Sequence, residues 1–242
     1  MKANGSAWIK NPSLPVATLL PLPANYYTLS NASTIVIKAG QHVGTVTLKV
    51  DSALFLADPL TLNSTYIVPF HITTADADTI LEPKRSLTVG IRYENMLFGN
   101  YLHGGVTTVK DVSGTVIQTI PYYTSRSQGD TRIWTLTTVA PNAVVSNGYS
   151  DQTSSSQKEI VLTLNGTDIT VSSAAGSTNT YLADGASTYN GAKLLQDRKI
   201  LLNYKYVVGT DTYYCKDTLT FRNRIRDGVN EWQDEDPSHY TK

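Results

Sequence analysis

Histidine side chains, the commonest catalytic and metal-binding groups, are few and scattered in this sequence of 242 residues. His42, His71, His103 and His239 lie far apart, and none has a metal-ligand partner at the short spacing of a compact site. The sequence motifs of serine hydrolases, zinc proteases, P-loop NTPases and Rossmann domains are also missing. We therefore expect a protein that is not an enzyme and that needs no metal or other cofactor.

Two acidic segments carry groups that could bind a cation or cleave a glycosidic bond. Asp76-Ala-Asp78 resembles the opening of a calcium loop, but neither its central glycine nor its terminal glutamate follows. The run from Glu231 to Asp236 holds several carboxylates, but neighbouring residues in a polar, proline-containing segment are seldom held across a substrate cleft. Both segments are typical of a solvated surface.

Aromatic residues are the positive signal, with 15 Tyr and 3 Trp against 4 Phe. A sugar ring has an apolar face of C–H groups that stacks on flat Tyr or Trp side chains while polar neighbours hold its hydroxyls. Tyr is also favoured on half-buried strands, and Trp134 has the alternating pattern of a core residue. The candidate ligand-binding residues are Tyr122 and Tyr123, in a predicted loop, and Trp232, in the polar C-terminal segment.

Charge and composition disfavour several classes of function. Lys and Arg (20) balance Asp and Glu (20), so no overall field attracts the chain to nucleic acid or to anionic lipid. The sequence contains no run of eighteen apolar residues that would predict a membrane helix, and its first residues lack the apolar run of a signal peptide. The single cysteine, Cys215, alternates in phase with Tyr213 and is predicted to be a small strand residue.

An alternation of period two dominates the chain and predicts strands. The first domain, predicted over residues 1–95, is an Ig-like β-sandwich with fewer strands than the usual seven, so its open edges would need another chain or leave it marginally stable. Pro69 lies inside one strand pattern and indicates an edge strand or a bulge, because proline cannot donate to a ladder. The strands of this domain are expected at 34–38, 43–50, 66–73 and 87–93.

The second domain, predicted over residues 96–242, is either a second antiparallel β-sandwich or a calycin-like barrel, because successive hairpins build both. Hairpin turns are predicted at Asn165-Gly166 and at Gly209-Thr210, and one short helix at 191–198. The strands are expected at 105–110, 115–120, 132–139, 159–164, 168–172, 199–206 and 217–222.

Several segments resemble a known pair of domains. Residues 24–30 (Ala-Asn-Tyr-Tyr-Thr-Leu-Ser), 37–46 and 66–72 are similar to the N-terminal sandwich domain of unknown function of Bacteroidetes surface lipoproteins. Residues 99–104 and 217–232 resemble the C-terminal domain of unknown function that commonly follows it. The resemblance implies an outer-membrane lipoprotein encoded beside a glycan-uptake system of the starch-utilisation type. The lipid-bearing cysteine of such proteins is not present in this chain, so the cell-surface location and the lipid anchor are inferred.

Two functions remain in balance at this point. The first is a non-catalytic, cell-surface glycan-binding accessory protein of a polysaccharide-uptake system, which needs an exposed aromatic side chain beside polar groups. The second is a cell-adhesion or spacer protein whose partner is a host or cell-surface protein, which needs only stable β domains. An enzyme, which needs a convergent acid and base, is the least favoured.

Overall fold

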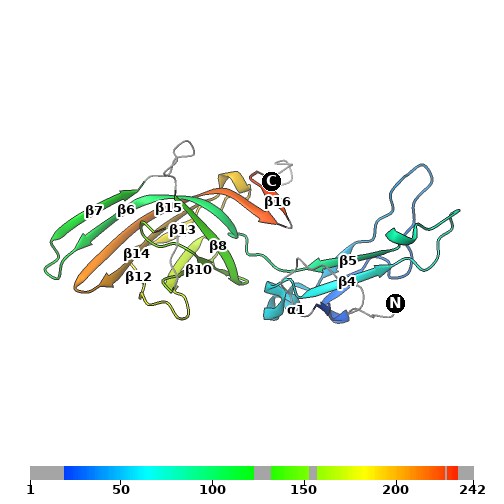
Figure 1. The fold of residues 1–242 in the computed structure, drawn as a ribbon, viewed down its shortest axis with the longest axis horizontal. Helices are drawn as coiled ribbons and strands as arrows, with labels where there is room; N and C mark the ends of the chain where they lie inside the picture. The colour runs from blue at the N-terminus through cyan, green and yellow to red at the C-terminus, as the bar shows by residue number, and fades with distance from the viewer. Residues whose placement is uncertain (1–18, 123–131, 153–156, 227, 234–242) are drawn as a thin grey trace. The chain divides into compact units, whose positions relative to one another are not determined.

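The computed structural model describes residues 19–122, 132–152, 157–226 and 228–233 (Figure 1). The chain divides into two compact units, one up to Tyr93 and one from Glu94 onward. Strands dominate both units, so the all-β fold predicted from the alternation is confirmed. Within the described ranges, no helix is long and apolar enough to cross a membrane.

The first unit consists of two small sheets around a core of Leu22, Phe55, Tyr66 and Val68. In the three-stranded sheet the order is β1-β4-β5, with β1 parallel and β5 antiparallel to β4, and β2 and β3 form an antiparallel pair. The elements are β1 (Leu20–Pro21), η1 (Ala24–Tyr26), β2 (Tyr27–Leu29), β3 (Leu48–Val50), α1 (Ser52–Ala57), η2 (Pro59–Leu62), β4 (Tyr66–His71), η3 (Glu82–Lys84) and β5 (Ser86–Ile91).

Pro69 lies where β4 has a neighbour on one side only. Strand β1 pairs with β4 at Tyr66 and Ile67 and goes no further, whereas β5 pairs along the whole of β4. From Val68 onward β4 is therefore an edge strand, where the missing N–H of a proline costs no ladder bond. The edge position predicted for Pro69 is confirmed.

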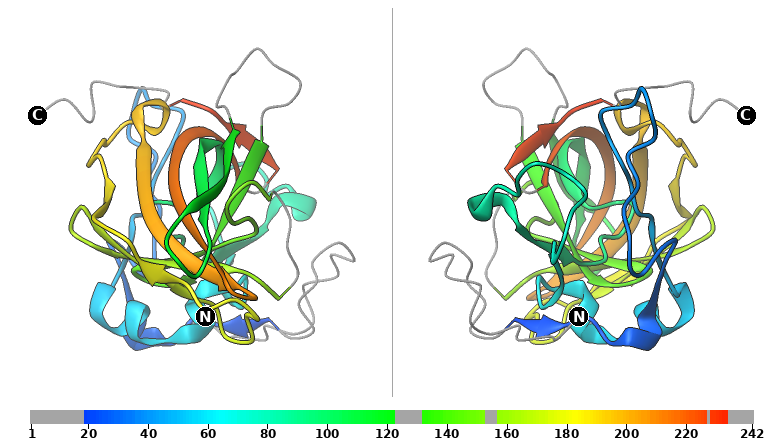
Figure 2. Two further views of the ribbon diagram at one scale, coloured as in Figure 1. Left: turned by 90° about the vertical axis from the view of Figure 1, so that its left-hand side faces the viewer. Right: turned by 90° about the vertical axis from the view of Figure 1, so that its right-hand side faces the viewer.

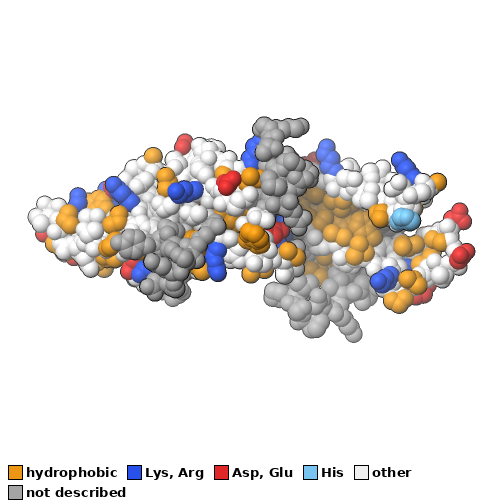
Figure 3. All heavy atoms as spheres, turned by 90° about the horizontal axis from the view of Figure 1, so that it is seen from above, with side chains coloured by type: hydrophobic (Ala, Val, Ile, Leu, Met, Phe, Trp, Pro, Cys, Tyr) orange, Lys and Arg blue, Asp and Glu red, His pale blue; other side chains and the backbone are white. Residues whose placement is uncertain are grey.

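The strand predicted at 34–38 is wrong, and the one predicted at 43–50 shrinks to β3. Ile35, Ile37 and Val43 are 58%, 59% and 72% exposed. No strand of the described residues pairs with residues 34–38 or 43–47. Alternation describes a strand's two faces, but a strand forms only where a partner satisfies its backbone. Figure 3 shows hydrophobic side chains gathered on the surface of the first unit.

A carboxylate between two phenols ties the short helices of the first unit to its sheet. Asp58 caps η2 and accepts hydrogen bonds from the hydroxyls of Tyr66, at 2.6 Å, and Tyr26, at 3.2 Å. The hydrogen bond to Asp58, with burial, raises the pKa of Tyr66 to about 12, and the same bond lowers the pKa of Asp58.

These shifts predict how the stability of the first unit depends on pH. The folded unit keeps the Tyr66 proton above pH 10, where the unfolded chain loses it, so stability falls as the pH rises from 10 towards 12. On the acid side, the Asp58 contribution is lost as the pH falls below about 4. Urea unfolding of the wild type and Tyr66→Phe between pH 8 and 12 checks this. An equal loss of stability at alkaline pH in both proteins would contradict this prediction.

The second unit contains a closed barrel, which decides between the two folds that its hairpin pattern allows. Following the hydrogen-bonded neighbours from β6 through β8, β9, β10, β11, β13, β14 and β15 leads back to β6, and every pair is antiparallel. The strands are β6 (Gly99–Lys110), β7 (Val116–Tyr122), β8 (Arg132–Ala140), β9 (Ala143–Ser146), β10 (Ile160–Asn165), β11 (Asp168–Ser173), β12 (Leu182–Ala183), β13 (Ser187–Tyr189), β14 (Lys199–Val208), β15 (Asp211–Arg226) and β16 (Val229–Glu231).

Figure 2 shows the strands of the second unit curving around a common axis. Side chains fill the barrel interior, as is usual when eight strands close. Trp134 is 0% exposed, so its predicted core role is confirmed. Cys215 lies in β15, as predicted for a small strand residue, and is 1% exposed. Much of the tyrosine excess serves the same purpose, because the buried rings of Tyr204 and Tyr206 both pack edge-on against the ring of Tyr181. The predicted hairpin turns join β10 to β11 and β14 to β15. The helix expected at 191–198 is reduced to η4 (Leu195–Asp197).

Three strands extend the sheet beyond the ring: β7, β12 and β16. Strand β6 changes partner along its length, pairing with β8 over 99–103 and with β7 over 105–110. The long strands β6, β7, β14 and β15 therefore continue past the barrel as an extended sheet, visible at the left of Figure 1. This sheet positions both sites described below.

Candidate functional site

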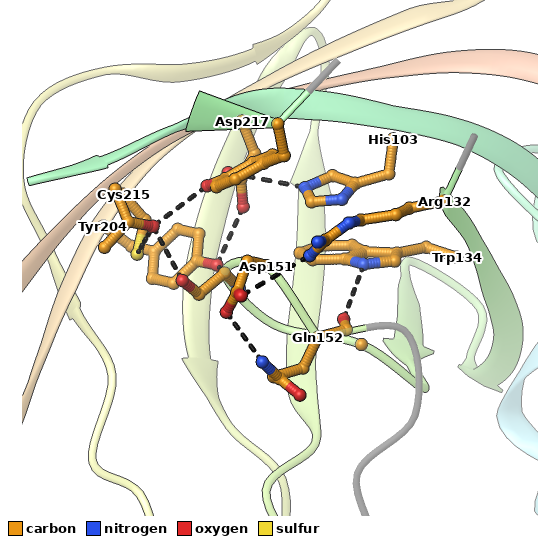
Figure 4. Close-up of polar contacts among 12 residues, drawn as sticks. His103, Arg132, Trp134, Asp151, Gln152, Tyr204, Cys215 and Asp217 are labelled. Carbon is orange, nitrogen blue, oxygen red and sulfur yellow. Dashed lines mark hydrogen bonds and ion pairs between the residues drawn. The ribbon is translucent and has the colours of Figure 1, made fainter. Parts of the chain in front are cut away.

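A buried carboxylate, Asp217, is the centre of a polar cluster inside the barrel (Figure 4). The hydroxyl of Tyr122 donates to its Oδ1, and that of Tyr204 donates to its Oδ2 at 2.8 Å. The Nε2 of His103 lies 3.4 Å from Oδ1. All four side chains are buried, so each hydrogen bond acts in surroundings of low dielectric constant and contributes more than it would at the surface.

Gly105 makes room for this cluster. It pairs with Asp217 of β15 on one side and with Tyr122 of β7 on the other, at the point where β6 changes partner. A Cβ atom at this position would meet the backbone oxygen of Lys216 at 2.2 Å and the Tyr122 ring at 3.0 Å. Only glycine therefore allows the Tyr122 ring to cross β6 and reach Asp217.

Hydroxyl groups extend the cluster across the barrel. The Ser150 N–H donates to the Tyr204 hydroxyl at 2.6 Å, and the Ser150 and Thr107 hydroxyls lie 2.6 Å apart. Thr107 also contacts the Tyr122 hydroxyl, at 3.0 Å, and the Cys215 sulfur, at 3.4 Å. Ser150 has a positive φ of 48°, an unusual conformation that these contacts hold in place.

Aromatic rings enclose the histidine side of the cluster. His103 is stacked between Trp134, with ring centroids 4.0 Å apart, and Tyr122, at 4.8 Å. The Trp134 indole donates to the backbone oxygen of Gln152 at 3.0 Å. Next to these rings, the Arg132 guanidinium lies 3.6 Å from Asp151 (Figure 4).

The chemistry of the cluster favours a structural role over catalysis. Burial raises the pKa of the Cys215 thiol to about 12, so it is protonated and weakly nucleophilic near neutral pH. Burial also raises the pKa of Tyr122 and Tyr204 far above 10, so neither phenol is poised to exchange a proton at neutral pH. The hydrogen bonds of Asp217 instead join three strands of the barrel and its extension.

The second site is a groove of about 420 Å³ on the outer face of the extended sheet. Its floor comes from β14 and β15, and its wall from the segment that leads into β12. Its lining combines threonines with apolar and aromatic residues and one lysine. The lining residues are Thr178, Thr180, Leu182, Lys205, Tyr206, Val207, Thr212 and Tyr214.

Tyr214 is held between two lysines on this face. The Nζ atoms of Lys110 and Lys205 lie 4.8 Å and 5.6 Å from the centre of its ring, within the range of cation–π attraction. Lys205 also pairs with Asp184 at 3.6 Å. Tyr213, the preceding residue, points to the opposite face and stacks on Tyr206. The sequence offered a signal for Tyr214 only through this alternation, since one residue of a Tyr-Tyr pair in a strand must face outward.

The three residues predicted to bind ligand differ in position and in exposure. Tyr122 ends β7 and is 4% exposed, so it cannot act as an exposed stacking surface, and its predicted loop is the end of a strand. Tyr123 lies outside the described residues. Trp232 follows β16 and is 59% exposed. Neither Tyr122 nor Trp232 lines the groove.

The described residues of the two acidic segments belong to no group of side chains that could hold a metal ion. Asp76 and Asp78 are exposed, and no group of three or more His, Cys, Asp or Glu side chains in the described ranges could hold a metal ion. Glu231 is engaged by Arg224 and by Arg226, the latter at 2.5 Å. Asp234, Glu235 and Asp236 lie outside the described residues.

A similar fold occurs in Bacteroides ovatus. A crystal structure of unknown function from this organism has a TM-score of 0.64 and 19% sequence identity, covering 89% of this chain and 76% of the other. A model for a family of N-terminal domains matches residues 10–79. No curated protein sequence matches the chain.

Two further solved structures show weaker similarity. One is an auxiliary nutrient binding protein from Bacteroides thetaiotaomicron VPI-5482, with a TM-score of 0.43, 18% identity, and 87% of this chain and 72% of the other covered. The other is a protein of unknown function from Bacteroides ovatus, with a TM-score of 0.39, 12% identity, and 90% and 74% covered.

Proposed function

We propose that this protein is a non-catalytic glycan-binding accessory protein of the bacterial cell surface and that its binding site is the groove over β14 and β15. The observation that carries the proposal is the mixed lining of the groove. Leu182, Val207 and the Tyr214 ring offer apolar contacts for the C–H faces of a sugar. Thr212 offers a hydroxyl that can donate or accept a hydrogen bond with a sugar hydroxyl, and the Thr178 hydroxyl, which donates to the backbone oxygen of Gln157, can accept one.

The absence of catalysis is part of the proposal. The groove lining contains no carboxylate or histidine that could act as a general base. The buried cluster around Asp217 shares no residue with the groove lining. The cell-surface location rests on the sequence resemblance to Bacteroidetes lipoproteins.

Replacing Tyr214 by alanine should weaken glycan binding by about tenfold or more, or ~1.4 kcal/mol, because the substitution removes the outward-facing aromatic ring of the groove. A glycan array identifies a bound oligosaccharide, and isothermal titration calorimetry then compares the variants. Trp232→Ala is the matched control, because it removes an exposed aromatic ring that does not line the groove. Loss of binding in Trp232→Ala alone would move the site to the β15–β16 hairpin.

The alternative is an adhesion or spacer role with a protein partner. The open edge of the first unit favours it, because β5 pairs with β4 alone among the described strands and Leu87 on it is 63% exposed. A folded protein that binds no sugar on the array would favour this function.

A further inference from the structure

The outer face of the extended sheet has an unusual distribution of charge. Directly paired residues lie on the same side of a sheet, so the register places Lys110, Lys205 and Tyr214 on one face. The outward positions of β14 (odd numbers 199–207), β15 (even numbers 212–220) and β6 (even numbers 106–110) contain four lysines and no Asp or Glu. The chain as a whole is neutral, with 20 basic and 20 acidic residues, so this face is locally positive.

Few acidic groups close to these lysines offset that charge. Asp184 pairs with Lys205, and both side chains are about one-third exposed, so the pair is accessible to solvent. The carboxylate of Asp111 accepts hydrogen bonds from the backbone N–H groups of Ser113 and Thr115, which hold it in the β6–β7 turn. Among the described residues, no carboxylate forms an ion pair with Lys110.

The two lysines next to Tyr214 also change what its ring can bind. A neutral sugar that stacks flat on the ring competes for the same space with the ammonium groups, at 4.8 Å and 5.6 Å from the ring centre. A carboxylate or sulfate on the sugar would instead form charge-assisted hydrogen bonds with those groups. The apolar and threonine residues that line the groove would still contact the rest of the sugar.

We propose that the groove binds an anionic glycan, whose uronic-acid carboxylate or sulfate ester pairs with Lys205 of the groove lining or with Lys110 on the same face, beside Tyr214. This inference rests on the proposed glycan-binding function and names its ligand class. It needs no metal and no covalent step.

Calorimetry with three oligosaccharides of equal length tests the inference: an oligogalacturonate, a chondroitin sulfate fragment and a neutral malto-oligosaccharide. We expect at least one anionic probe to bind tenfold or more tightly than the neutral one, and its affinity to fall as NaCl is raised from 50 to 200 mM. Lys110→Gln combined with Lys205→Gln should weaken that binding at least tenfold. Lys84→Gln is the control, because it removes an exposed lysine from the first unit.

The outcomes separate this inference from the proposed function. Equal binding of neutral and anionic probes, or binding of the neutral probe alone, overturns the anionic preference and leaves glycan binding intact. Anionic binding that survives the double lysine variant places the site elsewhere and overturns the assignment to the groove. No binding of any probe by a protein with native circular dichroism overturns both proposals.

Discussion

Replacing Asp217 by alanine should lower the free energy of unfolding of the barrel unit by about 3–5 kcal/mol, the usual cost of breaking a buried charged network. The substitution leaves the hydroxyls of Tyr122 and Tyr204 without their acceptor in a site that is closed to water. It also opens a cavity next to His103. The effect should be confined to the second unit, so an unfolding transition of the first unit should not move.

Urea unfolding followed by tryptophan fluorescence measures this loss, because Trp134 stacks on His103 beside the cluster. Tyr122→Phe removes one hydrogen bond and keeps the ring, so it should cost about 1–2 kcal/mol and remain measurable if the alanine variant does not fold. Asp184→Ala, which breaks a partly exposed ion pair, should cost less than about 1 kcal/mol. Equal losses in the Asp217 and Asp184 variants would contradict a structural role for the cluster.

Replacing Gly105 by alanine should be the most damaging single methyl addition in the barrel, with a loss of about 4 kcal/mol or more. Its φ is +154°, and the new Cβ would lie 2.2 Å from the backbone oxygen of Lys216. A backbone atom of a paired strand cannot rotate away as a side chain can. Strands β6 and β15 would have to separate, and Tyr122 would lose its path to Asp217.

Gly114→Ala is the control that distinguishes the effect of backbone strain from the effect of the steric clash. Gly114 also has a positive φ, +86°, but nothing lies within 4 Å of its added Cβ. The Gly114→Ala substitution should therefore lower the free energy of unfolding by only about 1 kcal/mol. Thermal unfolding monitored by circular dichroism, with soluble yield as a second readout, compares the two variants. A similar loss in both would show that conformation rather than the contact with Lys216 makes glycine necessary at 105.

The buried cluster and the groove occupy opposite faces of the same strands. Along β15, Cys215 and Asp217 face the interior, whereas Tyr214 and Lys216 face outward. The residues that stabilise the unit and those proposed to bind ligand are therefore interleaved in the sequence. Substitutions such as Lys110→Gln can test binding without disturbing the interior network.

Local patterns in the sequence determined most strands of the second unit. Alternation predicts β8, β10 and β11 to within one residue at each end, and Asn165-Gly166 marks the turn between the last two. These features depend on neighbours within a few residues, so they can be derived from the chain itself. The core role of Trp134 follows from the same pattern.

Only the tertiary structure decided which residues far apart in the sequence contact one another. Closure of the barrel depends on β6 pairing with β15, where Thr107 lies opposite Cys215, and no local pattern encodes that partner. The exposure of Tyr122 could not be predicted either, because its burial depends on Gly105 and Asp217 from two other strands. In the first unit, residues 34–38 alternate like a strand but find no partner among the described residues. Alternation determines which way side chains point, whereas long-range strand pairing determines what they meet.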